Sequence, residues 1–247
     1  MNTNSGKIAL ITGANKGIGF ETARQLGKAG VKVLIGARDQ ARADVAAAKL
    51  KSEGIDAEPL KLDVTSSADI QAAAAFIKAN YGHLDILVNN AGINAEGGFS
   101  FNNSATVTQS ELRKTFDTNF FAVVEVTQTL LPLIRKSPAG RIVNLTSILG
   151  SLTLHSDPSS PIAGSKALAY NASKTALNAF TVHLAAALKD TPIRVNSAHP
   201  GWVKTDMGGE GAIMEVVDGA KTSVALALAG ADSPNGAYLH LGKPLPW

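Results

Sequence analysis

The alternation of short apolar runs with longer alanine-rich segments constrains this 247-residue chain most strongly. The apolar runs, rich in β-branched residues, predict strands at 8–11, 31–35, 84–88, 141–145 and 193–198, with a weaker strand at 58–62. Segments of helical period predict helices at 17–29, 40–53, 67–80, 109–136 and 165–188. Strands that are apolar throughout and separated by helices form parallel sheets covered on both faces. We therefore expect a doubly wound α/β fold, with its ligand at the carboxyl ends of the strands.

The composition fits one domain over residues 1–247, because 45% hydrophobic residues suffice for one sizeable core and no linker or repeat interrupts the pattern. A net charge of +3 without basic runs gives no indication of a nucleic-acid partner. The chain has no cysteine, so disulfides and thiolate metal sites are excluded. It also lacks an apolar run long enough for a signal peptide or a membrane span, so we expect a cytoplasmic protein with no membrane partner.

A glycine-rich turn, TGANKGIG at 12–19, follows the first predicted strand and opens the first predicted helix. Glycines let the backbone approach a pyrophosphate, and a helix N-terminus offers free N–H groups and a positive dipole end. The spacing differs from the Gly-x-Gly-x-x-Gly fingerprint, but the position between strand and helix favours a dinucleotide site. The residues expected to hold the dinucleotide here are Gly13, Asn15, Lys16, Gly17, Ile18 and Gly19.

The end of the second predicted strand indicates which dinucleotide binds. An acidic residue at this point would bond the ribose 2′-hydroxyl of NAD, but Ala37 stands there, followed by Arg38. Arg38 and Lys16 could flank a 2′-phosphate, so the sequence predicts NADP(H) as cofactor. In the alternative, both cations are ordinary solvated charges and Asp39 turns inward to the ribose.

Tyr170 and Lys174 lie four residues apart in the predicted helix 165–188 and so share one face. A neighbouring cation favours the phenolate and lowers the tyrosine pKa, which would make the phenol a usable proton donor and acceptor. Taken alone, such a pair is more often a half-buried ring beside a solvated lysine.

Six motifs in order strengthen the catalytic interpretation: TGxxxGxG at 12–19, NNAG at 89–92, Asn119, Ser147, YxxxK at 170–174 and PG at 200–201. Together they resemble the short-chain dehydrogenase/reductase family from Thr12 to Thr205. The segments GANKGIG, ARD at 37–39 and PGWVKTDM at 200–207 resemble its NADPH-dependent carbonyl reductase branch. The resemblance implies a single-domain Rossmann fold with a mainly parallel seven-stranded sheet flanked by helices on both faces.

The resemblance also implies further cofactor contacts. Asp63 and Val64 would meet the adenine, whereas Val203 and Thr205 would hold the nicotinamide end. The remaining contacts fall on Asn90, Ala91, Gly92, Pro200 and Gly201, together with Tyr170 and Lys174. On sequence grounds Asp63 could instead start a turn, and Asn89 and Asn90 could be buried turn-formers.

The implied reaction is hydride transfer between NADPH and an aldehyde or ketone, reversible to the alcohol. Tyr170 would give its proton to the carbonyl oxygen, and Ser147 would orient that oxygen. Lys174 would lower the Tyr170 pKa and bond the nicotinamide ribose, and Asn119 would hold a water linked to Lys174. Ser147 could otherwise be a turn or cap residue, and Asn119 a polar residue facing a loop. No histidine spacing suggests a metal, so we expect metal-independent catalysis.

Two irregular stretches, 94–108 and 150–164, are candidate active-site loops. Ser147 and Tyr170 are 23 residues apart, more than the family's commonest pattern, so 150–164 should border the substrate pocket. The glycine-bearing segment 206–217 is expected to form a short mobile lid.

The sequence leaves several functions open. The expected partner is a small carbonyl or alcohol substrate. A 3-oxoacyl thioester on a carrier protein is a second candidate, although only Lys166 and Lys204 would offer a basic docking surface. A third is a non-catalytic NADP-binding regulatory protein. Apolar residues on the helices 109–136 and 165–188 also fit a homo-oligomer, which the 150–164 insertion could block.

Overall fold

The computed structural model describes residues 4–99 and 104–247. One eight-stranded sheet has the order β3-β2-β1-β4-β5-β6-β7-β8, parallel from β3 to β7 and antiparallel at β8. The strands are β1 (Ile8–Thr12), β2 (Lys32–Ala37), β3 (Ala57–Lys61), β4 (Ile86–Asn89), β5 (Arg141–Leu145), β6 (Arg194–Ala198), β7 (Tyr238–His240) and β8 (Lys243–Pro244). The predicted doubly wound, mainly parallel fold is confirmed. The eighth strand is an addition to the expected seven, and with two residues it is too short to show a periodic signal.

The strand order reverses between β1 and β4, which both pair with parallel neighbours on their other sides. Connections from β1 run toward β2 and β3, whereas those after β4 run toward β5 and β6. The loops after β1 and β4 therefore run in opposite directions from the carboxyl ends of these strands. In open α/β sheets, ligands bind in the crevice between two such loops.

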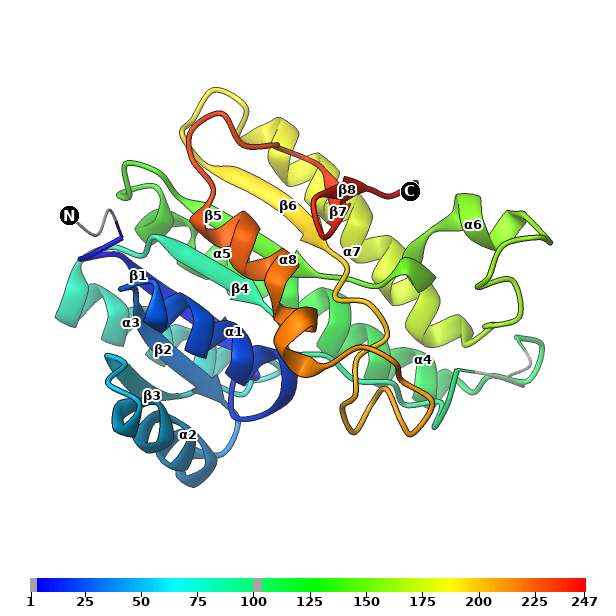
Figure 1. Ribbon diagram of the computed structural model, residues 1–247, viewed down its shortest axis with the longest axis horizontal. Helices are drawn as coiled ribbons and strands as arrows, with labels where there is room; N and C mark the ends of the chain where they lie inside the picture. The colour runs from blue at the N-terminus through cyan, green and yellow to red at the C-terminus, as the bar shows by residue number, and fades with distance from the viewer. Residues whose placement is uncertain (1–3, 100–103) are drawn as a thin grey trace.

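Helices cover both faces of the sheet, as Figure 1 shows with α1 and α8 crossing in front of the strands. The helices are α1 (Gly17–Lys28), α2 (Gln40–Ser52), α3 (Ser67–Tyr81), α4 (Gln109–Phe116), α5 (Ala122–Ile134), α6 (Leu152–Ser156), α7 (Leu168–Ala187) and α8 (Val216–Leu228), with a π-turn η1 (Asp117–Phe121) and a 3-10 turn η2 (Ile148–Gly150). Buried residues of α1, α2 and α8 form one core, and those of α3, α5 and α7 form the other. Side chains of β1 alternate between the two cores: Ile8 and Leu10 pack in one, and Ala9 and Ile11 pack in the other.

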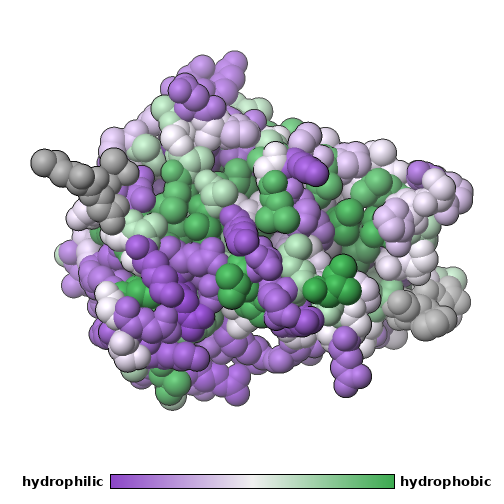
Figure 2. Space-filling view, viewed as in Figure 1, coloured by the Kyte–Doolittle hydropathy of each residue, from purple (hydrophilic) through white to green (hydrophobic). Residues whose placement is uncertain are grey.

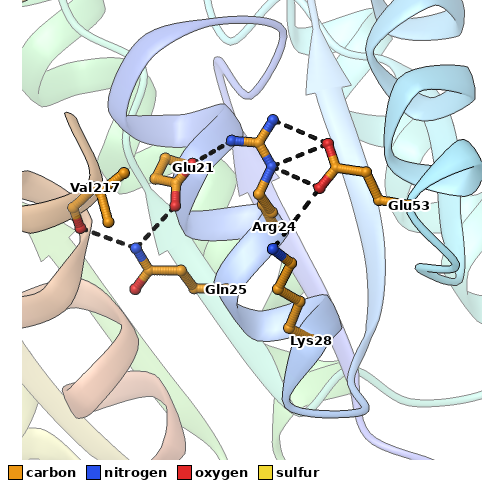
Figure 3. A network of polar contacts seen from close by, with 6 residues as sticks. All are labelled: Glu21, Arg24, Gln25, Lys28, Glu53 and Val217. Atoms are coloured by element: carbon orange, nitrogen blue, oxygen red, sulfur yellow. Dashed lines mark hydrogen bonds and ion pairs between the residues drawn. The ribbon is translucent and has the colours of Figure 1, made fainter.

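Polar side chains join the helices of the first core (Figure 3). Arg24 on α1 bonds Glu53, the C-cap residue of α2, with its closest ion-pair distance at 2.8 Å, and Glu21 at 2.5 Å. Gln25 donates to Glu21 at 3.0 Å and to the carbonyl of Val217 in α8 at 2.9 Å. This network fixes α1, the helix that begins in the glycine turn, against both of its neighbours.

Three predicted boundaries were wrong. The expected helix 109–136 is divided into α4, η1 and α5, because the π-turn inserts an extra residue per turn around Asn119. The expected helix 165–188 begins at Leu168. The expected loop 150–164 contains α6, which begins with the side chain of Ser151 accepting the N–H of Leu154 at 3.2 Å.

Helix α8 was missed because it combines β-branched residues with a glycine, which weakens the helical signal. Its position depends on tertiary packing. A Cβ at Gly219 would lie 2.6 Å from Cγ2 of Val203, so the glycine permits close approach to the turn that follows β6.

The face shown in Figure 2 is hydrophilic at its lower left, over α1 and α2, and carries hydrophobic patches toward the middle. Four large apolar side chains of the segment 202–217 are exposed by 39% or more: Trp202, Met207, Ile213 and Val217. Within the described residues, none of the helices is both long and apolar enough to cross a bilayer.

Candidate active site

A cavity of about 1510 Å³ opens at the carboxyl ends of the strands, across the point where the strand order reverses. Its wall includes every residue predicted to bind the cofactor, from Gly13 in the first turn to Thr205 after β6, and also Ser147, Tyr170 and Lys174. Of the predicted site residues, Asn119 alone is not part of this wall. The fold thus gathers segments from nearly the whole chain around one space.

The glycine turn has the geometry that a phosphate cradle requires. Gly13 and Gly17 have positive φ values of 64° and 58°, a region that side chains with a Cβ rarely adopt. A Cβ on Gly19 would lie 2.4 Å from Nδ2 of Asn90 and 2.7 Å from the carbonyl oxygen of Gly13. Among the described residues none caps α1 with its side chain, so the first N–H groups of this helix remain available to an anion.

Hydrogen bonds of Asn90 and Thr12 hold the glycine turn against the segment that follows β4. The Asn90 amide donates to the carbonyl oxygens of Thr12 at 2.7 Å and Gly13 at 3.1 Å. The Thr12 hydroxyl accepts the N–H groups of Asn90 and Ala91, each at 3.0 Å. Asn90 therefore does bond backbone groups of the turn, as the alternative interpretation expected. It also lines the cavity, as the cofactor prediction expected.

Three basic residues line the cavity near the glycine turn and the end of β2. Lys16 and Arg38 were expected at a 2′-phosphate, whereas Arg42 was not predicted. Asp39 accepts the N–H of Arg42 at 2.9 Å as the N-cap of α2, which gives its carboxylate a structural role there. Lys16 forms an exposed 2.5 Å ion pair with Asp206 of the 206–217 segment, so an anion at this end would compete with Asp206 for the lysine.

Asp63 and Thr205 each order the turn that contains them. The Asp63 carboxylate accepts the N–H of Thr65 at 2.9 Å and its hydroxyl at 2.7 Å, as the turn-forming alternative predicted. The Thr205 hydroxyl accepts the N–H of Gly208 at 3.2 Å. Both residues line the cavity, Asp63 two residues after the end of β3 and Thr205 in the segment between β6 and α8.

Ser147 follows β5 in a turn that fixes its backbone and leaves its hydroxyl proton free. Its carbonyl accepts the Tyr238 hydroxyl at 2.7 Å and the N–H of Gly150 at 2.8 Å. Its Oγ accepts the N–H of Leu149 at 3.2 Å, so its own proton can be donated elsewhere. The side chain of Ser147 lies near the Tyr170 phenol and acts to lower its pKa.

The acid–base groups are buried, and burial dominates their pKa values. Burial raises the pKa of Tyr170 to about 12, and the hydrogen bond from Ser147 partly opposes this rise. Burial lowers the pKa of Lys174 to about 8. The net shift of the Tyr170 pKa is upward, with burial as its largest cause, so the effect expected of Lys174 stays a prediction. The Lys174 ammonium lies 5.7 Å from the Tyr170 ring centre and donates to the Leu145 carbonyl at 2.9 Å, so desolvation outweighs its attraction for the phenolate.

Asn119 lies in the π-turn η1 and is completely buried. Its amide accepts the N–H of Ile93 at 2.8 Å and donates to the Ile93 carbonyl at 2.9 Å and to the Ser173 hydroxyl at 3.0 Å. Ser173 in turn bonds the carbonyl of Tyr170 at 2.7 Å. Asn119 therefore links the segment after β4 to the helix that carries Tyr170 and Lys174, and its expected role in holding a water stays a prediction.

Several residues near the site were not predicted individually. Phe99, Ile162, His199 and Trp202 line the cavity, and Glu96 bonds the backbone of Tyr170. Phe99 and Glu96 come from the irregular stretch 94–108 and Ile162 from 150–164, so the composition of these loops was the available signal. His199 differs, because its Nδ1 accepts the N–H of Ile148 at 3.2 Å. This contact spans β5 and β6, and nothing local in the sequence indicates it.

The fold and the cavity together define a dinucleotide-binding oxidoreductase site. A Cβ at Gly13 or Gly19 would meet neighbouring atoms at 3.0 Å or less, so the glycines leave room for close approach of a pyrophosphate, and Ser147, Tyr170 and Lys174 line the same cavity.

Comparison with known proteins identifies the family. The model of the short chain dehydrogenase family matches residues 7–214, so the chain belongs to this family. A short-chain dehydrogenase (anuI) of Penicillium roqueforti is 38% identical, over 90% of this chain and 89% of its own. Carbonyl reductase (NADPH) 1 of Mus musculus is 33% identical, over 99% of this chain and 100% of its own. The crystal structure of NADPH-bound carbonyl reductase from chicken fatty liver matches with a TM-score of 0.84 at 28% identity, covering 99% of this chain and 100% of that one.

Proposed function

We propose that this protein is an NADP(H)-dependent carbonyl reductase that converts an aldehyde or ketone to the alcohol, reversibly, with Tyr170 as general acid and base. The observation that carries the proposal is that Ser147, Tyr170 and Lys174 line the same cavity as the glycine turn. The relatives named above, two of them carbonyl reductases with NADPH in their names, support the same cofactor and reaction class.

Different residues along the cavity would hold different parts of the cofactor and the substrate. The glycine turn and the N-terminus of α1 would hold the pyrophosphate, and Lys16 and Arg38 would hold the 2′-phosphate. The region of Val203 and Thr205 would hold the nicotinamide end, and Lys174 the nicotinamide ribose. When bound, NADPH supplies the hydride. Ser147 would hold the substrate carbonyl oxygen, and Tyr170 would donate its proton to that oxygen as negative charge develops there.

The pKa values favour the reductive direction at neutral pH. With a pKa near 12, Tyr170 is protonated and ready to act as the acid. With a pKa near 8, Lys174 is mainly cationic at pH 7 and can stabilise the phenolate left after proton transfer. Oxidation of the alcohol needs Tyr170 as a base, so this direction should accelerate as the pH rises.

The carrier-protein alternative has less support. It would require Lys166 and Lys204 as free docking cations at the cavity mouth. Lys204 pairs with Glu215, and Lys166 donates to the carbonyl of His155 at 3.1 Å. The non-catalytic alternative is also weaker, since such a protein would have no need to keep Ser147, Tyr170 and Lys174 together on a buried cavity wall.

The test is loss of NADPH absorbance with a panel of small aldehydes, ketones and 3-oxoacyl thioesters, using the wild-type protein and Tyr170→Phe. Turnover of ketones or aldehydes by the wild type and its loss in the variant would support the proposal. Preference for the carrier-linked thioester would favour the second candidate. NADPH binding without turnover of any panel member would favour the regulatory one.

A further inference from the structure

The loop that follows β4 makes two contacts with Tyr170 that the proposed mechanism does not use. Oε2 of Glu96 accepts the backbone N–H of Tyr170 at 3.0 Å. The ring of Phe99 meets the Tyr170 ring edge to face, with ring centres 5.0 Å apart and an angle of 76° between the planes. One contact holds the backbone of the tyrosine and the other its ring.

Helix α7 needs a partner of this kind at its beginning. Its N-cap residue Ala167 has no side chain that can accept a hydrogen bond, and no acidic residue lies in its first turn. The N–H of Tyr170 is one of the donors that a helix leaves without an intrahelical acceptor. Glu96 supplies the acceptor from 74 residues away, and its carboxylate also complements the positive end of the helix dipole.

The loop carrying Glu96 is itself fixed. The N–H of Glu96 donates to Oδ1 of Asn94 at 3.0 Å, and the Asn94 amide donates to the Gly98 carbonyl at 2.8 Å. Ile93, the preceding residue, is held at both its N–H and its carbonyl by Asn119. Glu96 therefore connects Tyr170 to the end of β4 through a chain of ordered contacts.

We infer that Glu96 and Phe99 are positioning residues for Tyr170: Glu96 fixes where the tyrosine backbone lies at the start of α7, and Phe99 fixes the orientation of its ring over the cavity. The inference rests on the proposed role of Tyr170 as proton donor. Proton transfer depends steeply on distance and angle, so a small displacement of the phenol lowers turnover without affecting the nucleotide. Glu96 does not line the cavity, which separates its effect from cofactor binding.

Glu96→Ala and Glu96→Gln test the carboxylate. The alanine variant loses the acceptor and should lower kcat about tenfold, with the KM for NADPH unchanged. The glutamine variant keeps an acceptor oxygen without the charge and should stay within about twofold of wild type. If the alanine variant folds poorly, Glu96→Asp, whose shorter side chain withdraws the oxygen, replaces it. Rates are expressed per NADPH-binding site, so loss of folded protein cannot imitate the effect.

Glu111→Ala is the matched control. Glu111 and Thr108 form the capping box of α4, with Glu111 accepting the N–H of Thr108 at 2.8 Å. Removing this cap should lower the melting temperature and leave kcat unchanged, because α4 carries none of the proposed catalytic side chains. An equal loss of kcat in Glu111→Ala would show that general destabilisation explains both, and would overturn the inference.

Phe99→Leu tests the ring contact with Tyr170 and, combined with Glu96→Ala, whether the two residues act on the same group. It should also lower kcat, and the double variant with Glu96→Ala should lose less than the product of the two single losses, because both act on Tyr170. If Tyr170→Phe is inactive but Glu96→Ala has wild-type kcat, the positioning role fails and the proposed function stands. If Tyr170→Phe remains active, the proposed function itself fails.

Discussion

The two halves of the sheet place their functional residues in different ways. The cofactor half, β1 to β3 with the glycine turn and Arg38, takes its groups from short contiguous segments at the strand ends, and most of these groups are backbone N–H groups or surface cations. The catalytic half, β4 to β7 with α7, combines buried side chains from distant segments, as in the bonds of Tyr238 with Ser147 and of Glu96 with Tyr170. The cofactor half therefore relies on local conformation, and the catalytic half on tertiary packing.

Burial gives this difference an energetic consequence. Lys16 and Asp206 pair in solvent, where such pairs contribute little to stability. Lys174 and Tyr170 are almost completely buried, and both have shifted pKa values. The catalytic half thus holds its reactive groups at a cost in stability, whereas the cofactor half does not. Substitutions in the two halves should separate turnover, stability and nucleotide affinity.

Tyr170→Phe should have the largest effect. Removing the hydroxyl eliminates the proton donor and should lower kcat about 1000-fold, or about 4 kcal/mol, while NADPH affinity stays within about twofold. Steady-state kinetics and fluorescence titration with NADPH measure the two quantities. Tyr81→Phe removes a hydroxyl outside the cavity, where Tyr81 bonds Glu58, and should leave kcat unchanged. A similar loss of NADPH affinity in Tyr170→Phe would show that turnover and cofactor binding are not divided between the two halves.

Lys174→Met should stabilise the fold below pH 8 while abolishing most activity. The folded pKa of Lys174 is about 8 against an ordinary value of 10.5, so between these values the unfolded chain binds more protons. Stability from this group therefore rises with pH over that window, and the penalty for burying the charge is greatest below it. The variant should gain on the order of 2–3 kcal/mol at pH 7 and less than about 1 kcal/mol near pH 10, in each case less what is lost with the bond to Leu145.

Urea unfolding at pH 7 and pH 10 measures this difference. Lys78→Met, at an exposed lysine of α3, is the control and should show no pH-dependent gain. A constant difference between Lys174→Met and wild type at both pH values would contradict the depressed pKa.

Gly19→Ala should damage the cofactor half. The added Cβ would collide with Asn90 and with the carbonyl of Gly13, and the displaced turn should bind NADPH about 30-fold more weakly, or about 2 kcal/mol. The measurement is the NADPH dissociation constant. Gly230→Ala is the control, since a Cβ there meets no atom of the described chain within 4 Å. Unchanged affinity in Gly19→Ala would show that the turn does not need close packing at this glycine.

Arg38→Ala should have the smallest effect and the most specific one. Loss of one cation at the 2′-phosphate should raise the KM for NADPH about tenfold, or about 1.4 kcal/mol, and that for NADH less than about twofold. Lys51→Ala, on α2 but outside the cavity wall, should change neither value. Equal changes for NADPH and NADH in Arg38→Ala would count against the assignment of Arg38 to the 2′-phosphate.

Sequence patterns predicted different parts of the molecule with different success. Strands β1 to β6 were predicted, most of them because uninterrupted apolar runs have few other stable uses, whereas the short strands β7 and β8 were not. The π-turn at Asn119 was not, because an extra residue in a helical turn leaves the apolar pattern almost unchanged. The N–H of Tyr170 in the first turn of α7 is bonded by Glu96, a residue that no local signal connects to this helix.

The site shows the same division. The residues around the cavity could be predicted because motifs fix their place at strand ends. The rise in the Tyr170 pKa could not, since a pair four residues apart indicates proximity but not how much water surrounds it. The direction of the shift was decided by burial, which is a property of the assembled protein.

The sequence by itself determined the doubly wound fold, the glycine turn and the residue types at the strand ends, because hydrophobic periodicity and glycine conformation act over a few neighbouring residues. The tertiary structure alone decided that Glu96 and Phe99 contact Tyr170, that Tyr238 bonds Ser147, and that burial raises the Tyr170 pKa. These contacts join segments separated by tens of residues, so they exist only once the sheet and its helices have packed.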